Sequence, residues 1–350
     1  MSNARNDDVS YLYAARPRAN GTMKAVVMRV PGGPEVLKVE QMPVPRPGPG
    51  EVLIRVEAFG LNRSEMFTRQ GHSPGVQFPR VLGIEAVGTV AEAPLTEFVP
   101  GQTVATVMGG MGRQFDGSYA EYTRVPARQV RAITTALPWA KLGALPEMLQ
   151  TAWGALFRAL RLTRGERLLI RGGTTSVGLA AAAIAKAHGA EVSATSRSPE
   201  GEAKVRQAGA SRFFLDTGAI AEKVREQWDG GADKVLELVG ASTLADSLQC
   251  TRGSGVVCMA GMVGDRWSLR DFAPMDTIPT AVSLTTYSGD VADFMAMPLQ
   301  QLIDRVGTGA LAMAPGRVFH IDDIVQAHRA MESNLVGGKI VVLTGRGDEP

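Results

Sequence analysis

A short apolar strand that runs directly into a glycine-rich loop and then into a helix of small residues constrains this chain most. The strand is predicted over Arg167–Arg171, the loop reads Gly-Gly-Thr-Thr-Ser-Val-Gly at 172–178, and the helix opens with Leu-Ala-Ala-Ala-Ala-Ile. A strand that turns abruptly into a helix directs free backbone N–H groups at the loop, and the helix dipole adds about half a positive charge there. The sequence therefore predicts a binding site for a diphosphate group.

The glycines of this loop follow the G-x-G-x-x-G pattern of dinucleotide-binding loops only in part. Gly173 and Gly178 match the first and third glycines, whereas Thr175 occupies the middle position. Glycine permits a tight turn and a closely packed helix, and the neighbouring hydroxyl groups can donate to phosphate oxygens. An ordinary strand-to-helix turn is the alternative interpretation. The loop residues predicted to bind the cofactor are Gly173, Thr174, Thr175, Ser176, Val177 and Gly178.

Strands and helices alternate through the region that contains this loop. Such a βαβ rhythm predicts a doubly wound parallel sheet with helices on both faces. A helix is also expected over 145–160, because Leu149, Trp153, Leu156 and Leu160 fall on one face. The predicted strands cover 167–171, 191–195, 212–215, 233–239 and 255–259, and the predicted helices cover 177–188, 199–208 and 219–228.

The part of the chain before this region has β character. Residues 31–50 contain six prolines and four glycines, which exclude a long helix there. After Pro315 the β character returns, and a last strand is expected over 339–344. Residues 1–22 are polar and aperiodic, so they are expected to form a flexible tail. The other strands of this mostly-β part are predicted at 24–29, 51–58, 80–91 and 103–108.

Composition excludes several classes of protein. The chain has 350 residues, which suffices for about two domains, and its net charge of +2 comes without a basic stripe. No apolar run reaches the roughly 18 residues of a membrane span, and no apolar signal segment opens the chain. Cys250 and Cys258 are too few for a disulfide framework or an all-cysteine zinc site. We expect a cytoplasmic protein with no nucleic-acid or membrane partner.

The end of the second predicted strand indicates which dinucleotide binds. Sites that prefer NADH place a carboxylate about 20 residues beyond the glycine loop, where it accepts a hydrogen bond from the ribose 2′-hydroxyl. This chain has Ser196, Arg197 and Ser198 there, and no carboxylate. A guanidinium and two hydroxyls suit a 2′-phosphate, so NADPH is predicted over NADH. The alternative is that Arg197 is a solvated turn residue.

The order of these parts resembles that of the medium-chain dehydrogenase/reductase superfamily, and local matches extend from Met23 to Gly345. The resemblance implies an α/β fold with a Rossmann-type domain at 147–311 and a discontinuous GroES-like catalytic domain at 23–146 and 312–350, after the tail at 1–22. It also implies a cleft between the domains and a homodimer. The matching motifs are Pro-Arg-Pro-Gly-Pro-Gly-Glu-Val-Leu-Ile-Arg-Val (45–56), Gly-Leu-Asn-Arg-Ser-Glu (60–65), Leu-Gly-Ile-Glu-Ala-Val-Gly (82–88), Gly-Ser-Tyr-Ala-Glu-Tyr (117–122), Leu-Gln-Thr-Ala-Trp (149–153) and Gly-Gly-Lys-Ile-Val-Val-Leu (337–343).

The branch within the family depends on the zinc ligands. Zinc-dependent members carry Cys at the position of Asn62 and His at the position of Ile84, beside the carboxylate of Glu85. A catalytic zinc needs three protein ligands, and of these three residues only Glu85 could bind a metal. The segment 109–116 contains no cysteine for a structural zinc site, and the four histidines lack ligand spacing. We therefore predict no metal and a resemblance to the zinc-independent quinone oxidoreductases.

The absence of a Lewis acid limits the reaction. Quinones and other α,β-unsaturated carbonyl compounds accept a hydride without one, because the charge moves to a quinol or enolate oxygen that neutral donors can stabilise. Asn62 occupies a position that lies near the nicotinamide and the substrate in the similar quinone oxidoreductases, so it is the predicted catalytic donor. The proton is then expected from solvent. Alternatively, Asn62 caps a turn.

The resemblance implies four further cofactor-binding residues. Thr151 is expected to contact the nicotinamide amide, and Gly261 and Val263 are expected to line the nicotinamide ribose. Lys339 resembles a family lysine near the cofactor. Alternatively, Thr151 lies in the interior of a helix, Gly261 and Val263 form a turn, and Lys339 is a surface lysine.

This chain departs from the family pattern near the substrate and the 2′-phosphate. Glu65 and Phe67 stand where many quinone oxidoreductases carry Asp and Tyr, so a phenol donor is replaced by an apolar ring. Gly201 stands where a lysine is common. Arg197 is then left to hold the 2′-phosphate alone.

Two other functions stay open from the sequence. Enoyl-thioester reductases resemble this branch but carry a proton-donating tyrosine where this chain has Ser73, which counts against that activity. A non-catalytic NADPH-binding protein would keep the same glycine loop, so only turnover of quinones or enones separates it from an enzyme.

Overall fold

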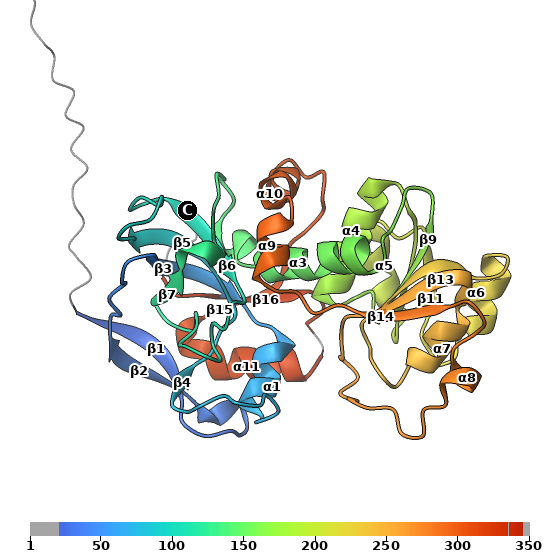
Figure 1. The fold of residues 1–350 in the computed structure, drawn as a ribbon, viewed down its shortest axis with the longest axis horizontal. Helices are drawn as coiled ribbons and strands as arrows, with labels where there is room; N and C mark the ends of the chain where they lie inside the picture. Colours follow the sequence, from blue (N-terminus) through green and yellow to red (C-terminus); the bar gives the residue numbers. More distant parts are fainter. Residues whose placement is uncertain (1–20, 335, 346–350) are drawn as a thin grey trace, which may run out of the picture.

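The structure is a computed structural model that describes residues 21–334 and 336–345. Two lobes lie side by side, one built on β1–β8 with β15 and β16, the other on β9–β14 (Figure 1). Most of the predicted tail, residues 1–20, lies outside the described residues, and β1 already begins at Thr22. The boundaries proposed between the two domains stay predictions.

The second lobe contains the predicted parallel sheet. Its six strands run in the order β11-β10-β9-β12-β13-β14, and every neighbouring pair is parallel. This order, with the first strand at the centre, is that of the doubly wound dinucleotide-binding fold. The strands are β9 (Arg167–Arg171), β10 (Glu191–Ser196), β11 (Arg212–Leu215), β12 (Ala232–Glu237), β13 (Thr251–Met259) and β14 (Ser283–Thr286).

Helices connect these strands, as the βαβ rhythm predicts. Three of them start and end within two residues of the predicted bounds. Two further helices, of six and four residues, are too short to show a helical period and were not predicted. The helices are α4 (Ser176–His188), α5 (Gly201–Gln207) and α6 (Ala221–Gln227), followed by the short α7 (Leu244–Gln249) and α8 (Pro274–Thr277).

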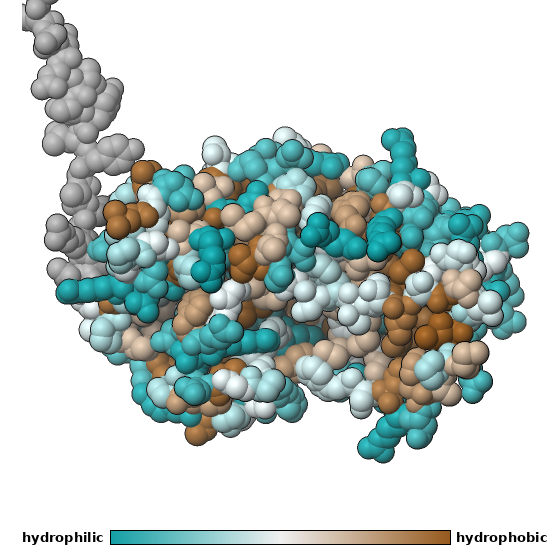
Figure 2. Space-filling model, in the orientation of Figure 1, coloured by the Kyte–Doolittle hydropathy of each residue, from teal (hydrophilic) through white to brown (hydrophobic). Residues whose placement is uncertain are grey.

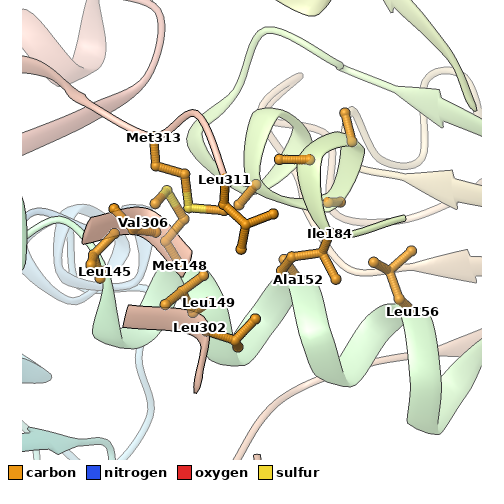
Figure 3. Close-up of a cluster of buried hydrophobic side chains, with 14 of the residues drawn as sticks. Leu145, Met148, Leu149, Ala152, Leu156, Ile184, Leu302, Val306, Leu311 and Met313 are labelled. Carbon is orange, nitrogen blue, oxygen red and sulfur yellow. The ribbon is translucent and has the colours of Figure 1, made fainter. Parts of the chain in front are cut away.

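The helix predicted over 145–160 is divided. It forms α3 (Pro146–Gly154), which continues as a π-helical turn over Ala155–Ala159. Leu149, Leu156 and Leu160 are fully buried, as their shared face predicts, whereas Trp153 of the same predicted face is only partly buried. Figure 3 shows this face packed with Ile184 of α4 and with Leu302 and Val306 of α10 (Leu299–Gly307), near which α9 (Val291–Ala296) also lies (Figure 1).

The first lobe contains a seven-stranded sheet to which both ends of the chain contribute. β16 (Lys339–Leu343) pairs with β3 (Glu51–Gly60) in antiparallel register, with Val341 opposite Gly60. The predicted return strand therefore runs beside the segment that leads to Asn62. The other strands of this sheet are β5 (Glu85–Glu92), β6 (Thr103–Val107), β7 (Tyr122–Pro126), β8 (Val130–Ala132) and β15 (Pro315–His320).

A smaller sheet and three helices complete this lobe. β1 (Thr22–Met28) lies between β2 (Leu37–Pro43) and β4 (Arg80–Val81). The helices are α1 (Arg63–Arg69), α2 (Trp139–Leu142) and α11 (Ile324–Glu332). Within the described residues, no helix has both the length and the apolar character that a membrane crossing requires.

Candidate cofactor site and active site

The glycine loop between β9 and α4 presents unpaired backbone donors. Gly172 has a φ of +84°, a left-handed conformation that favours glycine and turns the chain away from the strand. The backbone N–H groups of Thr174, Ser176 and Val177 make no hydrogen bond to any described residue. All three residues are only half-buried. These donors lie at the start of a 13-residue helix, which is the arrangement that binds phosphate.

Two residues of the loop act on its shape. A Cβ atom at Gly178 would lie 2.6 Å from the carbonyl oxygen of Gly172 and 2.8 Å from that of Gly173, so only glycine lets α4 approach the loop this closely. Thr175 is the N-cap of α4: its hydroxyl accepts from Gly178 N at 3.0 Å and donates to Gly172 O at 2.8 Å. Threonine in place of the middle glycine thus closes the turn, and its hydroxyl proton is already used.

A buried network supports the loop from behind. The backbone N–H of Gly172 donates to the Thr195 hydroxyl at 3.1 Å, and this hydroxyl donates to Asp216 at 3.2 Å. Asp216 in turn receives two hydrogen bonds, of 2.9 and 2.8 Å, from the fully buried guanidinium of Arg171. Asp246 binds the same guanidinium at 2.5 Å. This network, which sequence reasoning missed, joins the carboxyl ends of three neighbouring strands.

The end of β10 places Arg197 at the surface beside the loop. Ser196 is buried and its hydroxyl accepts from Ser198 N at 3.2 Å, while the Ser198 hydroxyl bonds the Glu200 carboxylate. Gly201 packs here against Ser196, and a Cβ atom on it would lie 2.9 Å from Thr174 Cγ2. The absence of the family lysine at this position therefore has a steric reason.

Asn62 lies at the start of α1 as its N-cap residue, and its backbone carbonyl, not its side chain, accepts from the first turn of the helix. The Glu65 carboxylate accepts from the Asn62 backbone N–H at 2.9 Å and from Ile84 N at 3.0 Å. The Asn62 side-chain amide donates to Glu85 Oε1 at 3.0 Å. Its further contacts, with Glu65 Oε1 at 3.3 Å and Gly60 O at 3.4 Å, are both long. One amide hydrogen is therefore only weakly held.

A lysine ammonium fills the centre of this cluster. Lys339 Nζ lies 2.5 Å from Asn62 Oδ1, 2.7 Å from Glu85 Oε1 and 3.2 Å from Glu147 Oε2. Its side chain is almost fully buried, so the surface-lysine alternative is wrong. Burial acts to lower the pKa of Lys339, but the carboxylates of Glu85 and Glu147 outweigh it and raise the pKa above its usual value. The ammonium stays charged.

The same cluster holds a carboxyl group that titrates near neutrality. Burial raises the pKa of Glu65 to about 7, against the opposite effect of the Lys339 ammonium and of the N–H of Ile84. Glu147 extends the cluster into α3, where the Thr151 hydroxyl donates to its Oε1 at 2.7 Å. Glu85 and Glu147 thus connect Asn62, Lys339 and Thr151 through hydrogen bonds and ion pairs. The sequence related these three residues only through the family resemblance.

The remaining predicted cofactor residues lie at the carboxyl end of β13. The backbone N–H of Val263 donates to Leu238 O at 3.2 Å. A Cβ atom at Gly261 would lie 2.7 Å from the same carbonyl oxygen, so the loop after β13 passes against the end of β12. Gly261 and Val263 therefore lie, like the glycine loop, at the carboxyl ends of the strands of the parallel sheet. Ligands bind at this end of the sheet in this fold.

The positions of the family's zinc ligands have other roles here. Ile84 is a buried apolar residue whose backbone supports Glu65, and Asn62 contacts the ammonium of Lys339. Among residues 21–334 and 336–345, no three His, Cys, Asp or Glu side chains are arranged to hold a metal ion.

Comparisons with known proteins identify the family. Residues 48–135 match the alcohol dehydrogenase GroES-like domain, and residues 176–298 match the zinc-binding dehydrogenase family. The quinone oxidoreductase of Rattus norvegicus is 30% identical over 332 residues, which cover 92% of this chain and 98% of that protein. This chain belongs to the medium-chain dehydrogenase/reductase superfamily, in its quinone oxidoreductase-like branch.

Solved structures agree with this assignment. An NAD-dependent alcohol dehydrogenase is 28% identical with a TM-score of 0.84, and a mycobacterial protein complexed with NADPH is 26% identical with a TM-score of 0.82. Each match covers 92% of this chain and 100% of the other. The predicted superfamily, Rossmann-type sheet and GroES-like domain are confirmed. The protein is an oxidoreductase that uses a nicotinamide dinucleotide and acts on a small molecule.

Proposed function

We propose that this protein is a zinc-independent, NADPH-dependent reductase of quinones or other α,β-unsaturated carbonyl compounds. The observation that carries the proposal is the cluster around Lys339 Nζ, with Asn62 Oδ1 at 2.5 Å and Glu85 Oε1 at 2.7 Å. An ammonium beside Glu85, with Asn62 and Ile84 at the other two positions, leaves one oxygen ligand where a catalytic zinc needs three protein ligands. The zinc-binding name of the matched family therefore does not extend to this site.

The residues at the glycine loop fit a dinucleotide. The free N–H groups of Thr174, Ser176 and Val177 would hold the diphosphate, and the close approach at Gly178 keeps the helix end against it. Arg197 supports the choice of NADPH, because a guanidinium at the end of β10 suits a 2′-phosphate and none of residues 196–198 is a carboxylate. The nearby carboxylate of Glu200 is bonded by the Ser198 hydroxyl. Gly261 and Val263 would line the nicotinamide ribose at the same carboxyl end of the sheet.

The chemistry needs little from the protein beyond position and a hydrogen bond. When bound, the dihydronicotinamide supplies a hydride to the conjugated carbonyl compound. The electron pair then moves through the conjugated system to the substrate oxygen, where the weakly held amide hydrogen of Asn62 would stabilise the charge. Lys339 and Glu85 fix the orientation of that amide, and water supplies the proton that completes the product. Thr151 would hold the nicotinamide amide.

We also propose a homodimer formed through the edge of the parallel sheet. β14 is the last strand of that sheet, and its outer side pairs with no described strand. Hydrophobic residues gather on the surface where β14 lies (Figure 2). An open edge of this kind pairs readily with a second chain.

Steady-state NADPH oxidation tests the proposed reaction. A panel of quinones, enones and a crotonyl thioester would be offered, and NADPH binding would be measured in parallel by calorimetry. We expect turnover of quinones or enones and little turnover of the thioester, because Ser73 stands where thioester reductases have a proton-donating tyrosine. Its hydroxyl is hydrogen-bonded to that of Thr68 at 2.8 Å. Bound NADPH with no turnover of any compound would show a non-catalytic binding protein instead.

A further inference from the structure

A pocket with a volume of about 490 Å³ lies between the two lobes. One wall belongs to α1, the helix that begins directly after Asn62. The other belongs to the loop that follows β13 and contains Gly261 and Val263. Both walls are thus continuous along the chain with residues that would face the nicotinamide, although those residues do not themselves line the pocket. Its lining includes Arg63, Phe67, His72, Asp265, Trp267 and Glu332.

Aromatic rings from both lobes meet in this pocket. The ring centroids of Phe67 and Trp267 are 4.4 Å apart at an interplanar angle of 67°, and those of His72 and Trp267 are 6.1 Å apart at 76°. Phe67 is only 8% exposed, whereas Trp267 is 48% exposed. The indole is thus anchored by edge contacts and leaves much of its surface open. A large apolar side chain exposed at a pocket is typical of a ligand site.

The acidic and arginine side chains around the pocket neutralise one another. Arg63 forms an ion pair with Asp265 across the two lobes, with 3.2 Å between Nη1 and Oδ1. Glu332 is paired with the fully buried Arg69. No carboxylate or guanidinium of this lining is left to bind an ionic group, so the pocket suits an uncharged occupant. The flat indole and the phenyl ring favour an aromatic one.

We propose that Trp267 and Phe67 determine substrate specificity and that their pocket takes an uncharged aryl group conjugated to the reacting alkene. This inference rests on the proposed reductase function and narrows its substrate class. An aryl group stacked on Trp267 would place the conjugated carbonyl toward the amide of Asn62. A short alkyl group in the same place would leave the exposed part of the indole uncovered.

A matched pair of enones tests this proposal. Benzylideneacetone and ethylideneacetone differ only in a phenyl or a methyl group on the β-carbon. We expect kcat/KM with NADPH to be at least about tenfold higher for the phenyl compound. Trp267→Ala should remove this preference mainly through a higher KM, and Trp267→Phe should retain most of it. Met275→Ala, which truncates a 94% exposed residue outside the pocket lining, is the control and should change neither substrate.

A binding measurement separates failure of the pocket from failure of the reaction. Acetonaphthone is aromatic and uncharged but has no conjugated alkene outside its ring, and calorimetry would measure its binding to the wild type and to Trp267→Ala. Binding that is lost in the variant supports the pocket even if no enone turns over. Equal kcat/KM for the two enones, or an equal loss for both in Trp267→Ala, would overturn the proposal while leaving the reductase function intact.

Discussion

Spacing in the sequence predicts some contacts of the buried cluster around Asn62 but not others. Asn62 and Glu65 are separated by three positions, the spacing of a capping box, and this signal could have located the buried carboxylate. No spacing relates Lys339 to Glu85 and Glu147. These three residues come from β16, β5 and α3, and only the pairing of β16 with β3 brings the ammonium to Asn62.

Arg197 provides a prediction about cofactor choice. Arg197→Ala removes the guanidinium at the end of β10, so the KM for NADPH should rise by about ten- to one-hundredfold, the range for a lost hydrogen bond to a charged group. The KM for NADH should stay unchanged because it has no 2′-phosphate. The control is Arg206→Ala, which removes an arginine that pairs with Glu202 on the surface of α5. Equal effects on both cofactors would contradict the assignment.

His328 provides a prediction about pH. Burial lowers its pKa to about 3, with Arg69 nearby acting in the same direction, and its Nε2 lies 3.1 Å from the Tyr119 hydroxyl. The folded protein keeps this ring neutral while the unfolded chain protonates it below about pH 6.5. The stabilising contribution is therefore complete above that pH and is lost as pH falls toward 3.

Urea unfolding of the wild type and His328→Gln measures this contribution. Between pH 7 and pH 5 the free energy of unfolding should fall by about 2 kcal/mol more in the wild type, at 1.36 kcal/mol per pH unit below the unfolded pKa. Glutamine can still bond the Tyr119 hydroxyl but does not titrate. Parallel pH profiles for the two proteins would show that His328 is not held neutral.

Among the elements, periodicity predicted five of the six strands of the parallel sheet, because regular stripes distinguish strands from helices, but it missed the edge strand β14. The prediction from periodicity failed where a helix or strand is short, or where tertiary contacts determine the local conformation. α7 has six residues, and α3 changes to a π-helical turn after Gly154, where a Cβ atom would collide with the Tyr287 ring. The threonine in the glycine loop was unexpected, and its role as the N-cap of α4 explains it.

The contact between α4 and the glycine loop can be tested by Gly178→Ala. The added methyl group would lie 2.6 Å from Gly172 O, so the helix end must move away from the loop. We expect the Kd for NADPH to rise at least about tenfold and the free energy of unfolding to fall by about 1–3 kcal/mol. Gly307→Ala in α10 is the matched control, since no atom lies within 4 Å of its Cβ position. Unchanged NADPH binding in Gly178→Ala would show that the loop does not hold the diphosphate.

For the molecule as a whole, the sequence predicted one mostly-β part, one α/β part and the return of the chain to β-strands near its C-terminus. These features are visible as changes of periodicity. The pocket between the lobes was not visible. Phe67 and Trp267 are 200 positions apart, and the loop that carries Trp267 has no regular pattern. Nothing in either segment alone shows that their rings meet.

The proposed dimer is tested by light scattering. The wild type should have twice the mass of one chain. Ser283→Lys with Thr286→Lys places charges on the two exposed residues of β14 and should yield a monomer, because lysine on an edge strand blocks further pairing. β11 is the strand at the opposite edge of the sheet, so placing a lysine there with Leu215→Lys, at an exposed residue, should leave the dimer unchanged. A monomeric wild type would contradict the proposal.

We propose that a lysine–carboxamide–carboxylate cluster, rather than zinc, supports hydride transfer in this enzyme. The most direct test is the rate of NADPH oxidation with a quinone or an enone after exhaustive chelation, with metal content measured on the same sample by mass spectrometry. We predict an unchanged rate in protein that contains no zinc, and a rate at least about tenfold lower in Asn62→Ala under the same conditions. A rate that disappears on chelation and returns with added Zn²⁺ would show that zinc, and not this cluster, supports hydride transfer.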